Sequence, residues 1–101
     1  MHRSTPLPAA IPVNVTVHPS GSRSAARLTS VGETRARLVG PLAEGPIYIE
    51  IPKVRGRRGR VAMLATVRWR DGDQAEVSID GMLPHHRERW RDLLVESGSA
   101  R

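Results

Sequence analysis

The sequence predicts an all-β fold, a six-stranded antiparallel β-barrel followed by one C-terminal α-helix. Six short segments alternate apolar and polar residues, are rich in Val, Ile and Ala, and are separated by turns containing Gly, Pro or Asp. No helical periodicity interrupts them, which excludes the alternating β–α–β order of a parallel sheet. Only the last segment, residues 84–96, changes to a helical period, so we expect its apolar stripe to cover the barrel mouth.

The chain of 101 residues has the length of a single domain. Residues 1–10 contain prolines and small residues without periodicity, so we expect a flexible N-terminal arm before a barrel domain spanning residues 11–97. The first strand is expected in IPVNVTVH, residues 11–18, where Ile and Val alternate with other residues. After the turn PSGS, residues 25–31 predict a weaker second strand.

The third and fourth strands are expected on either side of a loop. Residues 35–39 (RARLV) place Ala36 and Leu38 on the inner face and two arginines on the outer face. Residues 40–46 carry turn residues at both ends and are expected to form the loop. Residues 47–51 (IYIEI) then predict the fourth strand, because their three isoleucines share one face.

The fifth and sixth strands are expected to form a hairpin from residues 61–70 and 74–79. A three-residue loop, 71–73, keeps the apolar residues of both strands on the same face, with Gly72 free to adopt a positive φ. This register pairs Trp69 with Ala75, Val67 with Val77 and Ala65 with Ile79, and sets Arg68 opposite Glu76.

The C-terminal segment has the signature of a short amphipathic helix. Pro84 stands at an expected first helical position, where its missing N–H costs nothing. Trp90, Leu93 and Leu94 follow at i, i+3 and i+4 and form one apolar stripe. Gly98 lies past the expected end and fits a helix stop.

The composition points to an acidic or phosphate-bearing partner. The formal net charge of +6 comes from fifteen Arg and one Lys against ten acids. Arg offers a planar fork of hydrogen-bond donors suited to phosphate and to guanine. A GC-rich genome, in which Arg codons are favoured, would give the same composition without any such partner. The chain has no Cys, no apolar run of about 20 residues and no secretory signal, so we expect a cytoplasmic protein without membrane insertion.

This order of elements, together with several residues in it, resembles the PilZ domain family. That family has a six-stranded antiparallel split barrel, with a helix after the last strand, and the resemblance covers most of residues 11–95. Its signature comprises an RxxxR pair before the first strand and a (D/N)xSxxG turn between the second and third, followed by small, Arg, apolar. The segment VRWR, 67–70, is similar to the end of the family's fifth strand, and WRDLL, 90–94, to its closing helix.

The corresponding turn in this chain is SVGETRARL, residues 30–38. Ser30 stands where Asp or Asn is expected, Gly32 where Ser is expected, and Arg35 where Gly is expected. Ala36, Arg37 and Leu38 then match the family's continuation.

The resemblance implies a receptor for cyclic di-GMP, a dianionic dinucleotide. In the family's pattern two arginines of a mobile arm hold phosphate and the guanine edge, and an Asp or Asn accepts guanine N–H groups. The Ser reaches phosphate, and the Gly lets the backbone approach the ligand. In this chain the acceptor has become a hydroxyl and the Gly has become Arg35, which would be strained if a positive φ were needed there.

The arginine pair of the family's arm is incomplete. Arg3 lies near the place of the first arginine, but Leu7 occupies the second place. Arg23 and Arg27 have the RxxxR spacing, although they follow the expected first strand. Together with Arg35 and Arg37 they could hold an anion by another route, electrostatically and with strong salt dependence.

Two other signals have simpler interpretations. The loop VRGRRGR, 54–60, has the composition of an RNA-binding segment, and equally that of a solvated basic hairpin loop. Barrels that bind RNA usually present exposed aromatics, and with both tryptophans expected in the core only Tyr48 is a candidate. His85 and His86 are adjacent and should point about 100° apart on a helix, which disfavours a metal site.

No nucleophile, base and orienting group can be assembled from the chain, so we expect no enzyme and no cofactor. Three hypotheses remain. The first is a PilZ-like adaptor with a degenerate nucleotide site, which binds a protein partner of a motility, pilus or signalling assembly. The second is a weak cyclic di-GMP receptor that uses Arg3, Arg23 or Arg27 with Arg35 and Arg37. The third is a basic barrel that binds RNA or DNA through residues 54–60. The expected partner surface comprises Arg35, Arg37, Arg68, Arg55, Arg57, Arg58 and Arg60.

Overall fold

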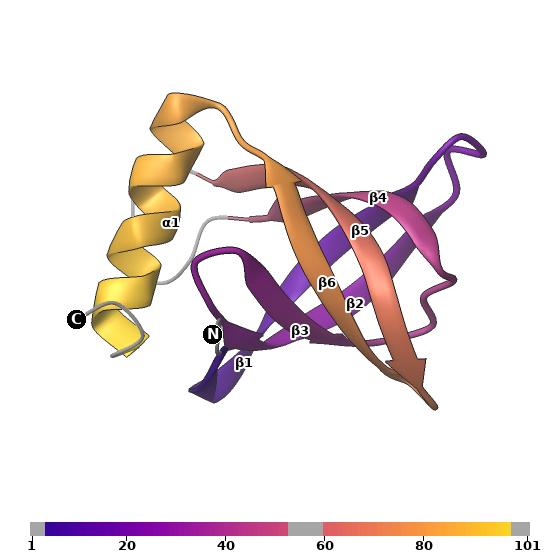
Figure 1. The fold of residues 1–101 in the computed structure, drawn as a ribbon, viewed down its shortest axis with the longest axis horizontal. Coiled ribbons are helices and arrows are strands. Elements are labelled where there is room, and N and C mark those ends of the chain that lie inside the picture. Colours follow the sequence, from indigo (N-terminus) through magenta and orange to yellow (C-terminus); the bar gives the residue numbers. More distant parts are fainter. Residues whose placement is uncertain (1–3, 53–59, 98–101) are drawn as a thin grey trace.

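The structure, a computed structural model, describes residues 4–52 and 60–97. Its elements are β1 (Thr5–Val17), β2 (Arg23–Val31), β3 (Arg35–Val39), β4 (Gly45–Ile51), β5 (Val61–Asp71), β6 (Gln74–Gly81) and α1 (Pro84–Ser97). The strands pair antiparallel in the order β1-β2-β3-β6-β5-β4 and close into a barrel (Figure 1). The predicted six-stranded antiparallel barrel with a C-terminal helix is therefore confirmed.

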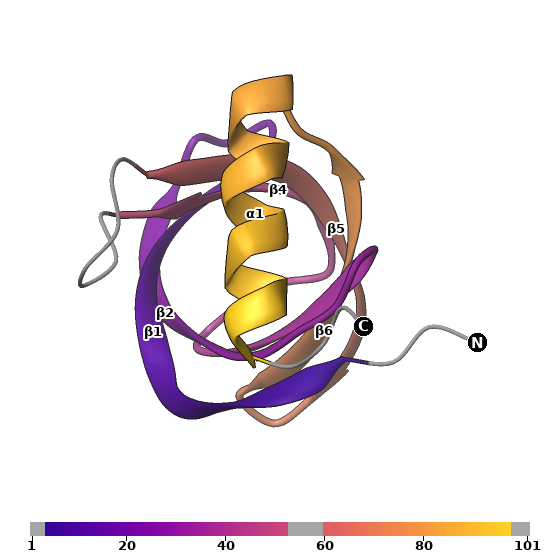
Figure 2. The same ribbon diagram turned by 90° about the vertical axis from the view of Figure 1, so that its left-hand side faces the viewer.

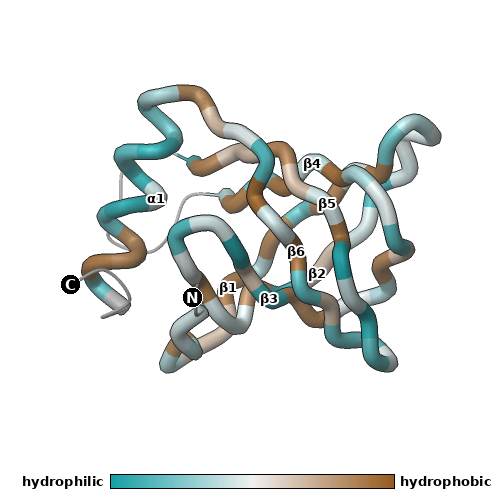
Figure 3. The backbone as a smooth tube through the Cα atoms, viewed as in Figure 1, coloured by the Kyte–Doolittle hydropathy of each residue, from teal (hydrophilic) through white to brown (hydrophobic). Residues whose placement is uncertain are grey.

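The core lies inside the barrel, because alternate residues of each strand point inward. Figure 3 shows this alternation as brown and teal segments along the strands. The inward positions predicted for the third and fourth strands are confirmed. The buried strand residues are Val13, Val15, Ala26, Leu28, Ser30, Val31, Ala36, Leu38, Ile47, Ile49, Ile51, Val61, Ala62, Met63, Ala65, Val67, Ala75 and Val77.

Helix α1 lies across one open end of the barrel (Figure 2). Its apolar stripe enters the core, since Trp90, Leu93 and Leu94 are all buried. The helix begins at Pro84, as predicted, and ends one residue beyond the predicted boundary. Leu42 is buried in the same core although the sequence suggests an ordinary loop there, and β4 begins at Gly45 within that expected loop.

Strand β1 begins six residues earlier than the sequence suggests. Residues 5–10, expected in the arm, belong to this strand, and Thr5 and Pro6 lie opposite Val31 and Ser30 of β2. The pairing shifts between Pro6 and Ile11, where the alternating pattern is missing. Pairing with the end of β2 therefore extends the strand beyond the segment that its own sequence pattern marks.

The predicted register of the β5–β6 hairpin is right in its middle and wrong at its tip. Val67 faces Val77 and Ala65 faces Ile79, as expected, but Trp69 faces Glu76 instead of Ala75. The turn has two residues, because Asp71 pairs with Gln74, and an irregularity between Val67 and Trp69 takes up the extra residue. Gly72 has the expected positive φ, +63°. Trp69 consequently turns outward and is 45% exposed.

Candidate functional site

The connection between β2 and β3 comprises residues 32–34, and the end of β2 that leads into it is buried. A register shift between Leu28 and Ser30 turns both Ser30 and Val31 inward, so Ser30 is 8% exposed. Within residues 4–52 and 60–97 no residue other than glycine has a positive φ, so Arg35 sits there without backbone strain. The strain that the sequence suggested for Arg35 is therefore absent.

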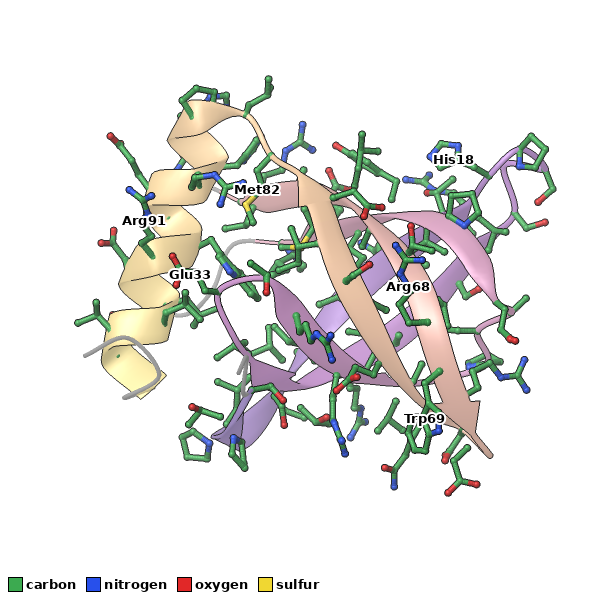
Figure 4. The ribbon with its side chains drawn as sticks, in the orientation of Figure 1. His18, Glu33, Arg68, Trp69, Met82 and Arg91 are labelled. Carbon is green, nitrogen blue, oxygen red and sulfur yellow. The ribbon has the colours of Figure 1, made fainter. Side chains whose placement is uncertain are left out.

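Helix α1 covers this turn. The indole Nε1 of Trp90 donates a hydrogen bond of 3.1 Å to the backbone carbonyl of Gly32, and both residues are buried. Gly32 is therefore part of the contact between helix and barrel. Glu33, next in the chain, is exposed and lies beside α1 in Figure 4.

Two of the predicted arginines meet a carboxylate on the outer face of the barrel. Arg35 and Arg37 alternate outward along β3, and β6 places Glu76 directly opposite Arg37. The Arg35 Nη1 lies 3.4 Å from Glu76 Oε2, and the Arg37 Nε lies 3.6 Å from Glu76 Oε1. The arginine side chains are half-exposed, at 50% and 48%, so water screens these ion pairs.

The same face carries the exposed tryptophan. The Arg37 guanidinium carbon lies 5.8 Å from the centroid of the Trp69 ring, within the range of a cation–π contact. Arg68 donates from Nε to Ser78 Oγ at 2.9 Å, and not to Glu76 as the predicted register implied. Figure 4 labels Arg68 and Trp69 along β5. We call this surface the arginine face: Arg35, Arg37, Arg68, Trp69 and Glu76.

The structure does not bring Arg23 and Arg27 to the arginine face. Both are exposed on β2, where Arg23 faces Thr16 of β1 and Arg27 faces Val39 of β3. Arg27 is thus level with the far end of β3, four residues from Arg35, which corresponds to about 13 Å along the strand. They instead line shallow hollows beside Asn14, on the outer side of β1 and β2.

The remaining predicted arginines divide into two groups. Arg3, Arg55, Arg57 and Arg58 lie outside the described residues. Arg60 is described, forms an ion pair with Glu50, and accepts through its carbonyl a hydrogen bond of 2.9 Å from Arg89 Nη1. Arg60 therefore interacts with β4 and α1 and not with the arginine face.

The two histidines lie at the start of α1, where the sequence places them. The ring centroids of His85 and His86 lie only 4.1 Å apart, with the rings tilted by 40°, and His86 Nδ1 lies 3.1 Å from the Arg60 carbonyl oxygen. Among the described residues no group of three or more His, Cys, Asp or Glu side chains could hold a metal ion. In that same part of the chain, no helix is long and apolar enough to span a membrane.

Sequence reasoning missed the role of Glu76, because the closing strand order that sets β3 beside β6 was not predicted. It also missed an apolar hollow formed by Tyr48, Leu64, Met82, Leu83 and His86. The available signal was Leu64, a large apolar residue out of phase with the buried positions of β5.

Comparisons with known proteins give matches at the level of structure. No protein-family model matches the chain, and no curated protein sequence matches it significantly. The PilZ domain of CeSA from a cellulose-synthesizing bacterium superposes with a TM-score of 0.68 at 15% identity, covering 89% of this chain and 94% of that one.

Two further solved structures have the same fold. The PilZ domain of YcgR from Escherichia coli with c-di-GMP matches with a TM-score of 0.67 at 16% identity, over 97% of this chain and 88% of that one. The Bacillus subtilis inhibitor of motility MotI/DgrA matches with a TM-score of 0.69 at 9% identity, over 98% of this chain and 53% of that one. This chain spans about half the length of MotI/DgrA and most of the other two. These similarities show that the chain has the fold of a PilZ domain.

Proposed function

We propose that this chain is a non-enzymatic signalling adaptor of PilZ type, in which cyclic di-GMP binding is weak or lost and protein contacts dominate. The fold supports a role related to those of its structural neighbours, one of which was solved with c-di-GMP and another of which is an inhibitor of motility. The partner would belong to a motility, pilus or signalling assembly in the cytoplasm.

The observation that carries the proposal is the position of Glu76 between Arg35 and Arg37. Two arginines alone would offer two positive charges to a phosphodiester, but with the carboxylate the cluster offers one. A phosphate approaching either guanidinium also approaches a like charge. The arginines that replace and follow the family's glycine therefore have their charge partly neutralised within the barrel.

The turn supports the same conclusion. Ser30, at the place of the guanine-binding Asp or Asn, is a nearly buried hydroxyl, which presents no carboxylate or amide to a guanine edge. Gly32, at the place of the phosphate-binding Ser, has no side chain and lies beneath Trp90. The positions that would read the base and hold the phosphate thus lack the required groups.

The arginine face is the protein-binding surface in this proposal. Trp69 is a large aromatic side chain exposed next to Arg37, and Trp and Arg are the residues that most often dominate protein–protein binding energy. Arg35 and Arg68, which contact Glu76 and Ser78, are exposed on the same face. A partner surface with acidic residues around an apolar or aromatic contact would complement this face.

The test is titration calorimetry of the full chain with cyclic di-GMP in low salt, with the YcgR domain as a positive control. We expect the dissociation constant to be weaker than millimolar, which corresponds to a binding free energy of less than about 4 kcal/mol. The site would then stay mostly empty at about 100 μM ligand, and no heat would be measurable. A micromolar dissociation constant would contradict the proposal and favour the receptor hypothesis. Loss of that binding in Arg23→Ser or Arg27→Ser would then identify the alternative arginine set.

A further inference from the structure

The barrel carries a second surface feature, an apolar groove distant from the arginine face. It encloses about 410 Å³ between the outer sides of β4 and β5, the end of β6 and the start of α1. Figure 4 places Met82 at this junction of β6 and α1. Leu64 and Trp69 are five residues apart on β5, so the groove and the arginine face are separated by about 16 Å along the strand.

Two large apolar side chains of this groove are left in solvent. Leu64 is 51% exposed and Leu83 is 61% exposed, and both line the same hollow with Tyr48 and Met82. A single exposed leucine is unremarkable, but a concave group of apolar side chains is typical of a site that another molecule covers. The volume falls at the small end of the range for binding pockets and fits a few side chains of a peptide segment.

The charges around the groove indicate the chemistry of its occupant. Of the two acids on the neighbouring strand positions, Glu50 forms an ion pair with Arg60, whereas Asp80 meets only the neutral Thr66 hydroxyl, at 2.6 Å, and keeps its negative charge. Arg89 donates to a backbone carbonyl, which leaves its positive charge uncompensated by that contact.

The start of α1 adds to this positive field. Its first turn contains His85, His86 and Arg87 and no acidic residue, at the end of the helix where the backbone dipole is positive. The chain as a whole carries a net charge of +6. An occupant that places carboxylates beside the groove is therefore electrostatically favoured. A second copy of this chain would instead bring the same basic groups together.

We propose that this groove docks a segment of a partner protein that carries large apolar side chains flanked by acidic residues. The apolar side chains cover Leu64 and Leu83, and the carboxylates face Arg89 and the start of α1. This inference deepens the proposed adaptor function and shares with it the need for a protein partner. It does not depend on the state of the nucleotide site.

The probe is a synthetic fluorescent peptide with leucine and tryptophan on one face and glutamate on the other. Two matched peptides replace glutamate by lysine, or the apolar residues by serine. We expect the first peptide alone to bind the full chain in an anisotropy titration. Leu64→Ser and Leu83→Ser should each weaken this binding about tenfold, because each removes an apolar contact at an exposed site. Val95→Ser, an equally exposed apolar residue elsewhere on α1, is the matched control and should change nothing.

Shift mapping by NMR locates the peptide and separates this inference from the proposed function. Shifts at Tyr48, Leu64 and Leu83 support the groove, even if cyclic di-GMP proves to bind. Shifts confined to the Trp69 indole and β3 would overturn the groove while leaving the arginine face as the protein-binding surface. Equal binding of the lysine peptide, no binding of any peptide at about 1 mM, or a self-dimer that Leu64→Ser dissociates would each overturn the proposal as well.

Discussion

Replacing Glu76 by Gln should increase the affinity of the arginine face for cyclic di-GMP. The change removes the charge that lies 3.4 Å from Arg35 and 3.6 Å from Arg37 while keeping the shape of the side chain. A phosphate held on the open side of either arginine would lie roughly 6 Å from the carboxylate. Because the side chains are half-exposed, the dielectric of water applies, and each phosphate then gains about 0.7 kcal/mol. Two phosphates gain about 1.4 kcal/mol, a tenfold increase in affinity.

The assay is a calorimetric titration of both proteins with cyclic di-GMP at low salt, carried to about 5 mM ligand so that weak binding by the unaltered chain is measurable, and repeated at about 0.3 M salt. The gain should shrink at the higher salt, where the Debye length falls below about 6 Å. Glu88→Gln is the matched control, since it removes an exposed acid of α1 and changes the net charge equally. Equal affinity of Glu76→Gln and the unaltered chain, or an equal gain in Glu88→Gln, would refute the local electrostatic reasoning.

Two further predictions concern stability and are checked by urea unfolding. Trp90→Phe removes the indole donor to the buried Gly32 carbonyl and should lower the free energy of unfolding by about 1–3 kcal/mol; an unchanged midpoint would show that this hydrogen bond does not hold the turn. Gly40→Ala would place a Cβ atom 2.9 Å from the Ala26 Cβ and should cost about 1–3 kcal/mol, whereas Gly81→Ala meets nothing within 4 Å and should be close to neutral. Equal destabilisation by the two glycine variants would contradict the steric explanation.

The strands could be predicted because their periodicity is local. In β4, Ile47, Ile49 and Ile51 alternate without interruption, and all three are buried. The helix could be predicted for the same reason, since Pro84 marks its start and Trp90 begins an apolar stripe with helical spacing. In each case the burial face and the secondary structure are encoded within one segment, so the pattern alone determines both.

The position of Trp69 could not be predicted in this way. Its alternation with Val67 suggests the core, but an irregularity at Arg68 reverses the face of every residue after it. The choice between a continuous ladder and this irregularity depends on pairing with β6, which also brings Glu76 beside Arg37. The arginine face therefore arises from strand order and register, which are properties of the whole barrel.

The contact between α1 and the β2–β3 turn has the same origin. Trp90 and Gly32 are 58 residues apart, and the apolar pattern predicts that Trp90 is buried without indicating which carbonyl its indole meets. The resemblance in sequence concerns the turn alone, whereas the helix determines what covers this particular turn. The sequence of the turn therefore indicated where the turn lies but not that Trp90 would contact it.

The hydrogen bond from Trp90 to Gly32 and the burial of Ser30 fix the turn, which has a consequence for Glu76→Gln. Removing the carboxylate restores positive charge at the arginines, but Ser30 is a nearly buried hydroxyl and supplies no carboxylate or amide that could accept the paired guanine N–H groups. Discrimination between bases requires such paired contacts, each worth about 1–3 kcal/mol. The variant should therefore bind cyclic di-AMP and cyclic di-GMP with affinities within about threefold of each other. A strong preference for the guanine dinucleotide would mean that another group reads the base, and the nucleotide site would then be more complete than the turn indicates.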